Sequence, residues 1–259
     1  MTTRKPLKNL EDFIDAISTL RGPDGCPWDR EQDHKTLKKY LLNESYELID
    51  AIDSGQPDEI CEELGDVLLQ VILHSQIASE KGQFDIEDVA RQIKEKIIHR
   101  HPHVFGDKTV KNADEVVVNW EAIKNKEKTE RDSALDGVPR SAPALMRAEQ
   151  LSKKAVAVGF EWPDIEMLWD TFYSEIDEFK QAINSRNKDR IKDEMGDMLF
   201  CIVNLARWYK IDPEMALQES NNKFISRFNL MEKNAGKNLT EFTQPELEEL
   251  WQEAKKTFK

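Results

Sequence analysis

Apolar side chains recur at intervals of three and four residues along most of this chain, which is the spacing of one face of an α-helix. The first such face runs from Leu10 to Leu20, and the stretch 64–77 is apolar almost all round, as in a buried helix. No stretch alternates with the two-residue period of a strand. We therefore expect an all-α fold. The predicted helices are 10–20, 36–53, 58–79, 85–100, 116–128, 144–156, two acidic helices, one that begins at Asp212, and 244–256.

Turn-forming residues divide this series into two halves of similar order. A loop rich in glycine and proline at 21–29 follows the first helix, and a break at 159–163 follows the helix over 144–156. The segment between the halves has the charge and proline content of a linker. We expect tandem repeats, each with a helical hairpin in a four-helix-type bundle. The predicted boundaries are 1–128 for the N-terminal repeat, 129–142 for the linker and 143–259 for the C-terminal repeat.

Two sets of four acidic residues define the repeat. In each set, two carboxylates lie three residues apart on one predicted helix and two more lie three apart on the next, so each pair shares a helix face. The turn segments 54–57 and 184–187 should fold each pair of helices into a hairpin. Every acid of the first set has a counterpart 131 positions later. The sets are Glu44, Glu47, Glu63 and Asp66, and Glu175, Glu178, Glu194 and Asp197.

The surroundings of these acids predict a metal site. Glu44 falls within the apolar stripe of its helix, and the apolar stretch 64–77 contains Asp66. Carboxylates gathered beside apolar side chains repel one another and lose hydration, so they need cations or protons. A hard divalent cation with oxygen ligands suits them, and we expect Mg²⁺. The alternative is a solvated acidic face, but strict repetition on apolar helices argues against it.

Basic and aromatic residues recur as well and suggest a nucleotide site. Each half has a lysine and an arginine four residues apart, and a tryptophan followed four residues later by a lysine. The ring can stack on a base and the cations can hold phosphates. The alternative is a core tryptophan with solvated cations around it. The candidates are Lys96, Arg100, Trp120 and Lys124 in the first half and Lys223, Arg227, Trp251 and Lys255 in the second.

The composition of these 259 residues argues against several classes of protein. The net charge of −13 argues against direct binding of nucleic acid or of an anionic membrane. No apolar run reaches the ~18 residues of a membrane span, and no apolar core of a secretory signal follows the first basic residues. Three widely spaced cysteines fit a reducing compartment. We therefore expect a cytoplasmic protein.

Several other kinds of site lack the residues they require. The chain has no P-loop motif and no Glu-x-x-His pair of a di-iron bundle, and a Nudix-like run at 59–65 lacks its upstream glycine and glutamate. Histidines at 99, 101 and 103 are interrupted by Pro102 and have no counterpart in the second half. We expect helix-end hydrogen bonds there rather than a metal.

The E-x-x-E…E-x-x-D pattern on paired helices resembles the MazG family of the all-α nucleoside triphosphate pyrophosphohydrolase superfamily. The similarity runs nearly end to end and includes the tandem layout. Where family members often open the motif with two glutamates, this chain has Asn43–Glu44 and Ser174–Glu175. The supporting stretches are CPWD at 26–29, HPHVFGD at 101–107, LDGVP at 135–139, PALMRA at 143–148 and GFEW at 159–162.

The resemblance implies Mg²⁺-dependent hydrolysis of ribo- and deoxynucleoside triphosphates, with broad base specificity, to a monophosphate and pyrophosphate. It also implies a homodimer and a role in cleaning or regulating the nucleotide pool. Glu175, Glu178, Glu194 and Asp197 would be the catalytic metal ligands. The implied substrate-binding residues are Thr171, Arg190, Lys223, Arg227, Trp251 and Lys255. Two other classes stay open: a module that binds metal without turnover, and an interaction protein, for example a partner of a stress-response regulator.

The approaches to the second acidic helix differ in charge between the repeats. Four cations lie within 186–192, whereas 56–62 has three acids and no cation. Arg190 lies four residues before Glu194 and shares its face, and Glu59 occupies the corresponding place in the first repeat. A triphosphate would meet attraction at one site and repulsion at the other. We therefore expect the C-terminal repeat to carry most of the turnover.

Overall fold

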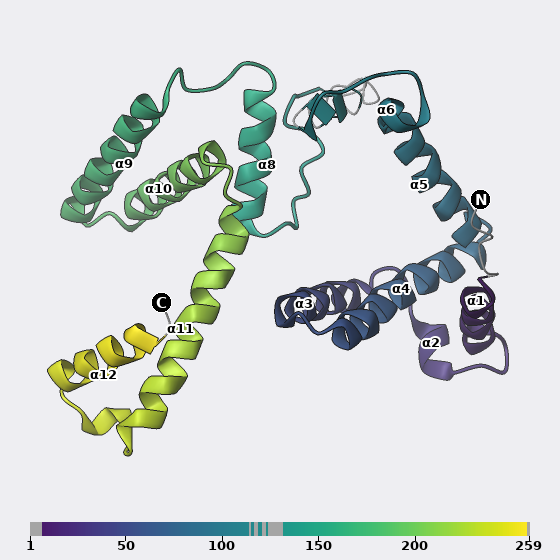
Figure 1. Ribbon diagram of the computed structural model, residues 1–259, viewed down its shortest axis with the longest axis horizontal. Coiled ribbons are helices and arrows are strands. Elements are labelled where there is room, and N and C mark those ends of the chain that lie inside the picture. Colours follow the sequence, from purple (N-terminus) through teal and green to yellow (C-terminus); the bar gives the residue numbers. More distant parts are fainter. Residues whose placement is uncertain (1–6, 114, 117–118, 121–122, 124–131, 258–259) are drawn as a thin grey trace. The chain divides into compact units, whose positions relative to one another are not determined.

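The computed structural model describes residues 7–113, 115–116, 119–120, 123 and 132–257, and the chain divides into two compact units (Figure 1). Unit 1 is Met1–Thr129 and unit 2 is Glu130–Lys259. Every regular element within the described ranges is a helix, which confirms the all-α prediction. Each unit contains a long antiparallel hairpin with further helices packed against it.

Unit 1 is built around α4 (Pro57–Ser79), which pairs with α3 (Lys38–Ser54) to form the hairpin. Helices α1 (Lys8–Arg21) and α5 (Ile86–Arg100) also contact α4. Two short helices, α2 (Pro27–Glu31) and α6 (Pro102–Phe105), lie in the connections. The core draws on α1, on α4 and on the residue that precedes α3. Its buried members are Ile17, Leu37, Ile72, Leu73 and Ile77.

Two polar contacts fasten the segment between α1 and α3 to α4. The Arg21 guanidinium, almost fully buried, donates from Nε and Nη2 to the two oxygens of Glu80, at 2.8 Å each. The rings of His34 and His74 stack, with their Nδ1 atoms 2.8 Å apart, so one nitrogen donates to the other. These contacts give a segment with little regular structure a fixed position on the hairpin.

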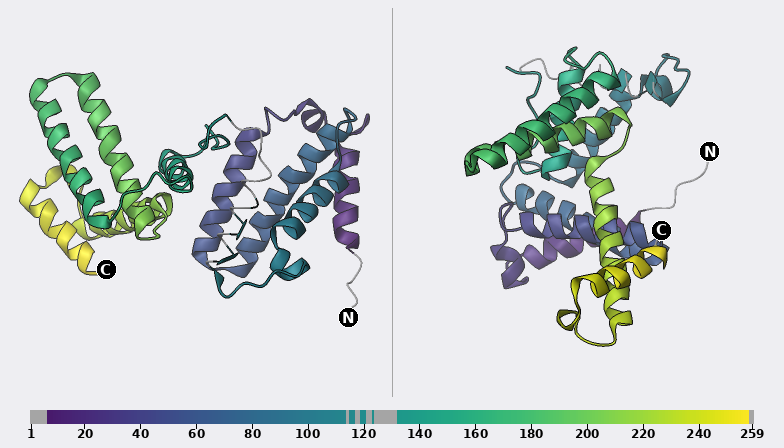
Figure 2. Two further views of the ribbon diagram at one scale, coloured as in Figure 1. Left: turned by 90° about the horizontal axis from the view of Figure 1, so that it is seen from above. Right: turned by 90° about the vertical axis from the view of Figure 1, so that its left-hand side faces the viewer.

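Unit 2 repeats the hairpin with α9 (Ile165–Ser185) and α10 (Lys188–Trp208) (Figures 1 and 2). Helix α8 (Ala144–Val156) packs on α10, and α11 (Pro213–Ala235) contacts both. After a 3₁₀ turn, η1 (Leu239–Glu241), the helix α12 (Gln244–Thr257) folds back on α11. A buried hydrogen bond of 2.6 Å between Ser152 Oγ and Asn204 Oδ1 joins α8 to α10.

Most of the predicted helices are present with similar bounds. The helix expected over 144–156 has those bounds as α8, and Asp85 and Asp212 cap α5 and α11. The predicted helix 116–128 is described only in part, with helical residues at 116, 119–120 and 123. Helices α2 and α6 were not predicted, because each is a single turn that begins at a proline inside a stretch assigned to a loop.

The outer face of α4 departs from the prediction of a helix buried on all sides. Leu64, Leu68 and Val71 are 52%, 38% and 37% exposed. Helices α3, α1 and α5 contact α4, but these three side chains stay partly outside those contacts. Across the described ranges, no helix has the length and apolar character needed to cross a membrane.

The two hairpin turns share one backbone shape with different residues. Gly55 follows α3 with φ 68°, and Arg186, 131 positions later, follows α9 with φ 55°. Both residues occupy the left-handed region that commonly ends a helix and that glycine adopts most easily. The turn geometry is therefore preserved although the glycine is not.

Replacement of Gly55 by alanine should lower the free energy of unfolding by about 1 kcal/mol because of the left-handed φ alone. An added Cβ would meet no atom within 4 Å. Gly65, in the middle of α4 and equally open, is a matched control: Gly65→Ala should stabilise by about 0.5–1 kcal/mol. Urea unfolding of both variants measures the difference. Destabilisation by Gly65→Ala as large as that by Gly55→Ala would contradict this account.

Candidate functional site

Three acids of each predicted set come together on each hairpin. In unit 1 one carboxylate oxygen from each of Glu44, Glu63 and Asp66 lies within 4.8 Å of the others. In unit 2 the same holds for the three counterparts, Glu175, Glu194 and Asp197. One residue of each trio comes from the first helix of the hairpin and two from the second. The turn between the helices therefore sets the spacing of the oxygens.

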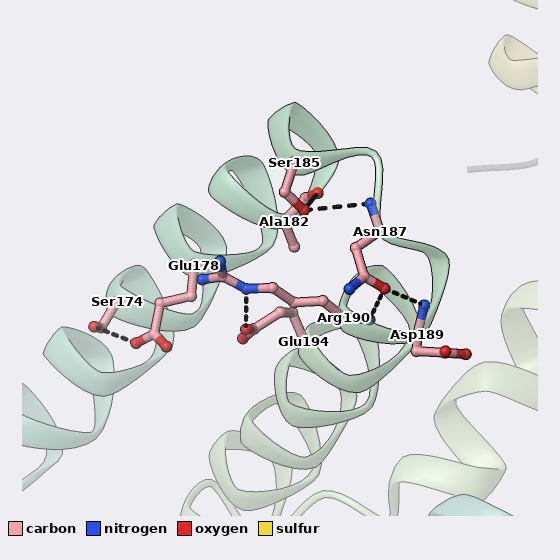
Figure 3. A network of polar contacts seen from close by, with 8 residues as sticks. All are labelled: Ser174, Glu178, Ala182, Ser185, Asn187, Asp189, Arg190 and Glu194. Carbon is pink, nitrogen blue, oxygen red and sulfur yellow. Dashed lines mark hydrogen bonds and ion pairs between the residues drawn. The ribbon is translucent and has the colours of Figure 1, made fainter.

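The fourth acid of each set lies outside the trio. Glu47 is exposed and accepts a hydrogen bond of 2.7 Å from Asn43 Nδ2. Glu178 is exposed and accepts one of 3.2 Å from Ser174 Oγ (Figure 3). Both residues are close enough to add negative charge to the trio, but their role as ligands stays a prediction.

The protonation of the trios reflects their crowding. The pKa of both Glu44 and Glu63 is raised. The main cause is that burial removes their carboxylates from water, and the second is repulsion from Glu47. Removal from water, followed by repulsion from Asp197, raises the pKa of Glu175. Cys201 lies one turn after Asp197 on α10. Burial, and then repulsion from Glu175 and Asp197, raise the pKa of its thiol to about 11. Both hairpins thus hold carboxylates that resist being charged together.

This donor set suits a hard divalent cation. All of the donors are carboxylate oxygens, which Mg²⁺ prefers, and their mutual repulsion is the term that a bound cation would remove. In unit 1 the Oε2 atom of Glu63 is buried and has no hydrogen-bond partner in the described chain. A buried oxygen without a partner is destabilising. A metal ion bound to Glu44, Glu63 and Asp66 would provide one.

The hairpins differ most at the start of their second helix. In unit 2, Arg190 Nε lies 3.5 Å from Glu194 Oε1, so this cation lies beside the trio (Figure 3). An open groove of about 560 Å³ begins there, lined by Asp189, Arg190, Lys192, Asp193, Gly196 and Asp197. In unit 1 the corresponding residue is Glu59, whose carboxylate accepts a hydrogen bond of 2.6 Å from Ser54 Oγ and helps to raise the pKa of Glu63.

The predicted base-binding and phosphate-binding residues of unit 2 lie elsewhere in the unit. Lys223 and Arg227 are on α11, and Trp251 and Lys255 are on α12. Figures 1 and 2 show α12 and the adjoining part of α11 extending away from the α9–α10 hairpin. Helix α12 packs on α11, so Trp251 and Lys255 are held against α11.

Trp251 lines an aromatic groove of its own. Its ring lies 5.3 Å from that of Phe224, which stacks on Phe228. The groove has a volume of about 540 Å³ and is lined by Phe224, Phe228, Met231, Gln244, Pro245, Leu247, Glu248 and Trp251. The two phenylalanines were not among the predicted residues, although their spacing of four residues on one helix puts them on one face.

Thr171 is the predicted substrate-binding residue on α9, one turn before Glu175. Its hydroxyl donates to the Met167 carbonyl at 2.9 Å and accepts from Trp162 Nε1 at 3.2 Å. This contact with Trp162 was not predicted from the sequence. It fixes the segment before α9 on the helix that carries Glu175.

The first-unit counterparts gather around the end of α5. Trp120 lies 5.6 Å from the Arg100 guanidinium and meets the His101 ring edge-on at 4.9 Å. His101 Nδ1 donates to the Ile97 carbonyl at 2.7 Å, which is a helix-end hydrogen bond of the predicted kind. Lys96 lies on the same helix, and Lys124 is outside the described residues.

Neutralising one acid of a trio should stabilise the metal-free protein. Since the folded state raises the pKa of Glu175, its charge opposes folding at neutral pH, and Glu175→Gln should raise the melting temperature in EDTA by a few degrees. Added Mg²⁺ should then stabilise the parent more than the variant. Glu219→Gln, on an exposed part of α11, is the control and should change little. Differential scanning fluorimetry measures all three. A lower melting temperature of Glu175→Gln in EDTA would contradict the repulsion account.

Comparison with known proteins places these hairpins in a family. The model of the MazG nucleotide pyrophosphohydrolase domain matches residues 32–105 and again 164–230, which span the two acidic hairpins. A Thermotoga maritima protein named nucleoside triphosphate pyrophosphohydrolase/pyrophosphatase MazG is 44% identical, over 95% of each chain. An Escherichia coli K12 nucleoside triphosphate pyrophosphohydrolase is 41% identical over 96% of this chain and 98% of its own. Bacillus subtilis YabN is 47% identical over 95% of this chain and 51% of its own. The chain belongs to the MazG nucleotide pyrophosphohydrolase family, with the domain present twice.

Proposed function

We propose that this protein hydrolyses nucleoside triphosphates to a nucleoside monophosphate and pyrophosphate, that the reaction requires Mg²⁺, and that both ribo- and deoxynucleotides are substrates. The observation that carries the proposal is the trio of carboxylate oxygens within 4.8 Å on each hairpin. The relatives that match nearly end to end are named for this activity. A role in cleaning or regulating the nucleotide pool follows from the breadth of the proposed substrates.

Different side chains of unit 2 would hold the metal ion, bind the phosphates and accept a proton. Glu175, Glu194 and Asp197 would hold Mg²⁺, which neutralises charge on the leaving pyrophosphate and makes water more acidic. Arg190, which lies beside Glu194, would pair with phosphate oxygens. A carboxylate of the set accepts the proton of the water that attacks the α-phosphorus. Exposed Glu178, one turn from Glu175, can reach solvent for this transfer.

The charge beside each trio favours unit 2 as the main catalytic unit. Arg190 there replaces Glu59 of unit 1, so an approaching triphosphate meets a cation at one site and a further anion at the other. At ~4 Å and an effective dielectric of ~20, this exchange amounts to several kcal/mol before screening. Both groups are solvent-accessible, which reduces the difference, but even ~1.4 kcal/mol changes a rate tenfold.

A second copy of the chain would complete the site. Apolar side chains on the outer faces of the unit 2 hairpin are exposed, among them Tyr173, Leu199 and Ile202 at 58%, 45% and 42%. Burying them against a second copy is favourable. The proposed base-binding Trp251 is on α12, which packs on α11 and extends away from the α9–α10 hairpin, so a homodimer would bring such a residue to the trio of its partner.

Incubation of the purified protein with a nucleoside triphosphate and Mg²⁺ should yield equal amounts of monophosphate and pyrophosphate. In water labelled with ¹⁸O, the label should appear in the monophosphate, because the attack is on the α-phosphorus. EDTA should abolish turnover. Chromatography and mass spectrometry identify the products; a diphosphate with orthophosphate would show that a different bond breaks.

The two units should respond differently to the same substitution. Asp197→Asn should lower kcat/KM by at least about 100-fold, which corresponds to ~2.7 kcal/mol of transition-state stabilisation. The matched change in unit 1, Asp66→Asn, should leave activity within about twofold of the parent. Continuous measurement of pyrophosphate release tests both. Inactivation by Asp66→Asn with Asp197→Asn tolerated would overturn the charge argument.

The assembly is tested by its mass in solution. Size-exclusion chromatography with light scattering at micromolar concentration should report twice the 30.1 kDa of one chain. Tyr173→Glu with Leu199→Glu, which place charge on the exposed apolar face, should shift the protein towards the monomer. A monomer for the parent protein under these conditions would argue against the homodimer.

A further inference from the structure

A separate groove lies at the start of α3 in unit 1, at the end of the helix opposite to the hairpin turn. It has a volume of about 560 Å³, within the range of sites that hold small molecules. Its walls come from α2, from the segment that follows it and from the first turn of α3. The lining residues are Trp28, Gln32, Lys35, Thr36, Lys38, Lys39 and Tyr40.

One wall of this groove is aromatic. Trp28 is 50% exposed and meets Tyr40 edge-on, with ring centroids 5.8 Å apart and planes at 76°. Tyr40 is held in place because it packs against the hydrophobic core of unit 1. An exposed indole braced by a second ring offers a flat surface on which a nucleobase can stack.

The rest of the groove is cationic. Lys35, Lys38 and Lys39 are exposed, and no carboxylate is among the lining residues. The nearest acid along the chain, Asp33, points its Oδ1 at its own backbone: it accepts from the N–H of Lys35 at 2.7 Å and of Thr36 at 2.8 Å. Three lysines therefore line one groove of a chain whose net charge is −13. This local excess attracts phosphate groups.

Contacts within unit 1 fix the walls of the groove. Arg21 pairs with Glu80 and also donates to the backbone carbonyls of Asp29 and Gln32, which fixes α2 and its end. His34 is held by His74, and Leu37, 1% exposed, anchors the segment between the lysines. A ligand would therefore not have to order this segment when it binds.

The second repeat differs from the first in the charge at these positions. Leu37 and Leu168, 131 positions apart, are both buried, which fixes the register of the helix. In that register Lys35 corresponds to Glu166, Lys38 to Trp169 and Lys39 to Asp170. A tryptophan is retained three residues nearer the helix, where Trp162 contacts Thr171, the counterpart of Tyr40. Two of the three lysines are thus replaced by acids, and the cationic lining is specific to unit 1.

We propose that this groove binds a nucleotide without hydrolysing it, with the base on Trp28 and the phosphates on Lys35, Lys38 and Lys39. The lysines balance the phosphate charge, so binding needs no divalent cation. This property separates the groove from the carboxylate trios, which repel a triphosphate when no metal is present. Unit 1 would then report nucleotide levels to the enzyme as a regulatory site.

The test is equilibrium dialysis of the full-length protein with ATP in EDTA, where the proposed Mg²⁺-dependent hydrolysis does not occur. The variant Lys35→Glu with Lys39→Asp carries the residues of unit 2 at these positions. Its Kd for ATP should rise at least tenfold. The control, Lys8→Glu with Lys94→Glu, makes the same change in net charge at exposed sites of α1 and α5, and its Kd should stay within twofold of the parent. Circular dichroism melting verifies that both variants fold.

A second pair of measurements separates the base from the phosphates. Trp28→Ala should raise the Kd for ATP at least tenfold and leave the Kd for inorganic tripolyphosphate within twofold of the parent. The double lysine variant should raise both Kd values. Three results would each overturn the proposal: no saturable ATP binding in EDTA up to about 5 mM, equal weakening in the two double variants, or loss of tripolyphosphate binding in Trp28→Ala. A protein that binds ATP in this way but shows no turnover with Mg²⁺ would refute the proposed hydrolysis and leave the groove standing.

Discussion

Repulsion between carboxylates is the constraint on which the arrangement of both units depends. Each hairpin brings three carboxylate oxygens within 4.8 Å, and the helices that carry them are largely apolar. Burial and mutual repulsion raise the pKa of Glu44, Glu63 and Glu175, so the folded chain holds charge in a place that resists it. The apolar contacts of the hairpins and the hydrogen bonds that fasten their neighbours must outweigh this repulsion. A divalent cation turns the same geometry into a stabilising one.

The two hairpins share this geometry and differ in where their cations lie. In unit 1 the lysines stand at the start of the first helix, and acids stand at the turn that leads into the second. In unit 2 the order is reversed: Glu166 and Asp170 stand at the start, and Arg190 and Lys192 at the turn. Each unit therefore attracts anions to the opposite end of the same fold. A tandem repeat can in this way divide substrate turnover and ligand sensing between its copies without changing its backbone.

Helices and the acidic trios were accessible from the sequence because both depend on local spacing. The capping residues Asp85 and Asp212 and the bounds of α8 follow from rules that act within one turn of helix. In each set of four acids, three come together, and the fourth, Glu47 or Glu178, lies close enough to raise the pKa of its neighbours.

Relations between distant elements were harder to predict. Spacing placed Trp251 and Lys255 on one face, but no local rule told whether that face meets the acidic hairpin of the same copy. The groove at Trp28 was missed for a related reason. Its wall includes α2, a single turn within a loop rich in glycine and proline, and its lysines converge only because Arg21 and His34 fasten that loop to α4. Such tertiary contacts leave no periodic signal.

The turn before α10 shows how charge and backbone preference compete. Gly55 adopts its left-handed conformation easily, whereas Arg186 holds the same conformation with a side chain that disfavours it by about 1 kcal/mol. Arg186 also begins the run of four cations that leads to Arg190. The second repeat thus keeps a mildly strained residue where a relaxed one is sterically available. The strained residue at this turn adds a positive charge beside the acidic trio. At position 186, therefore, the residue that gives the most stable turn is not the residue that attracts anions most strongly.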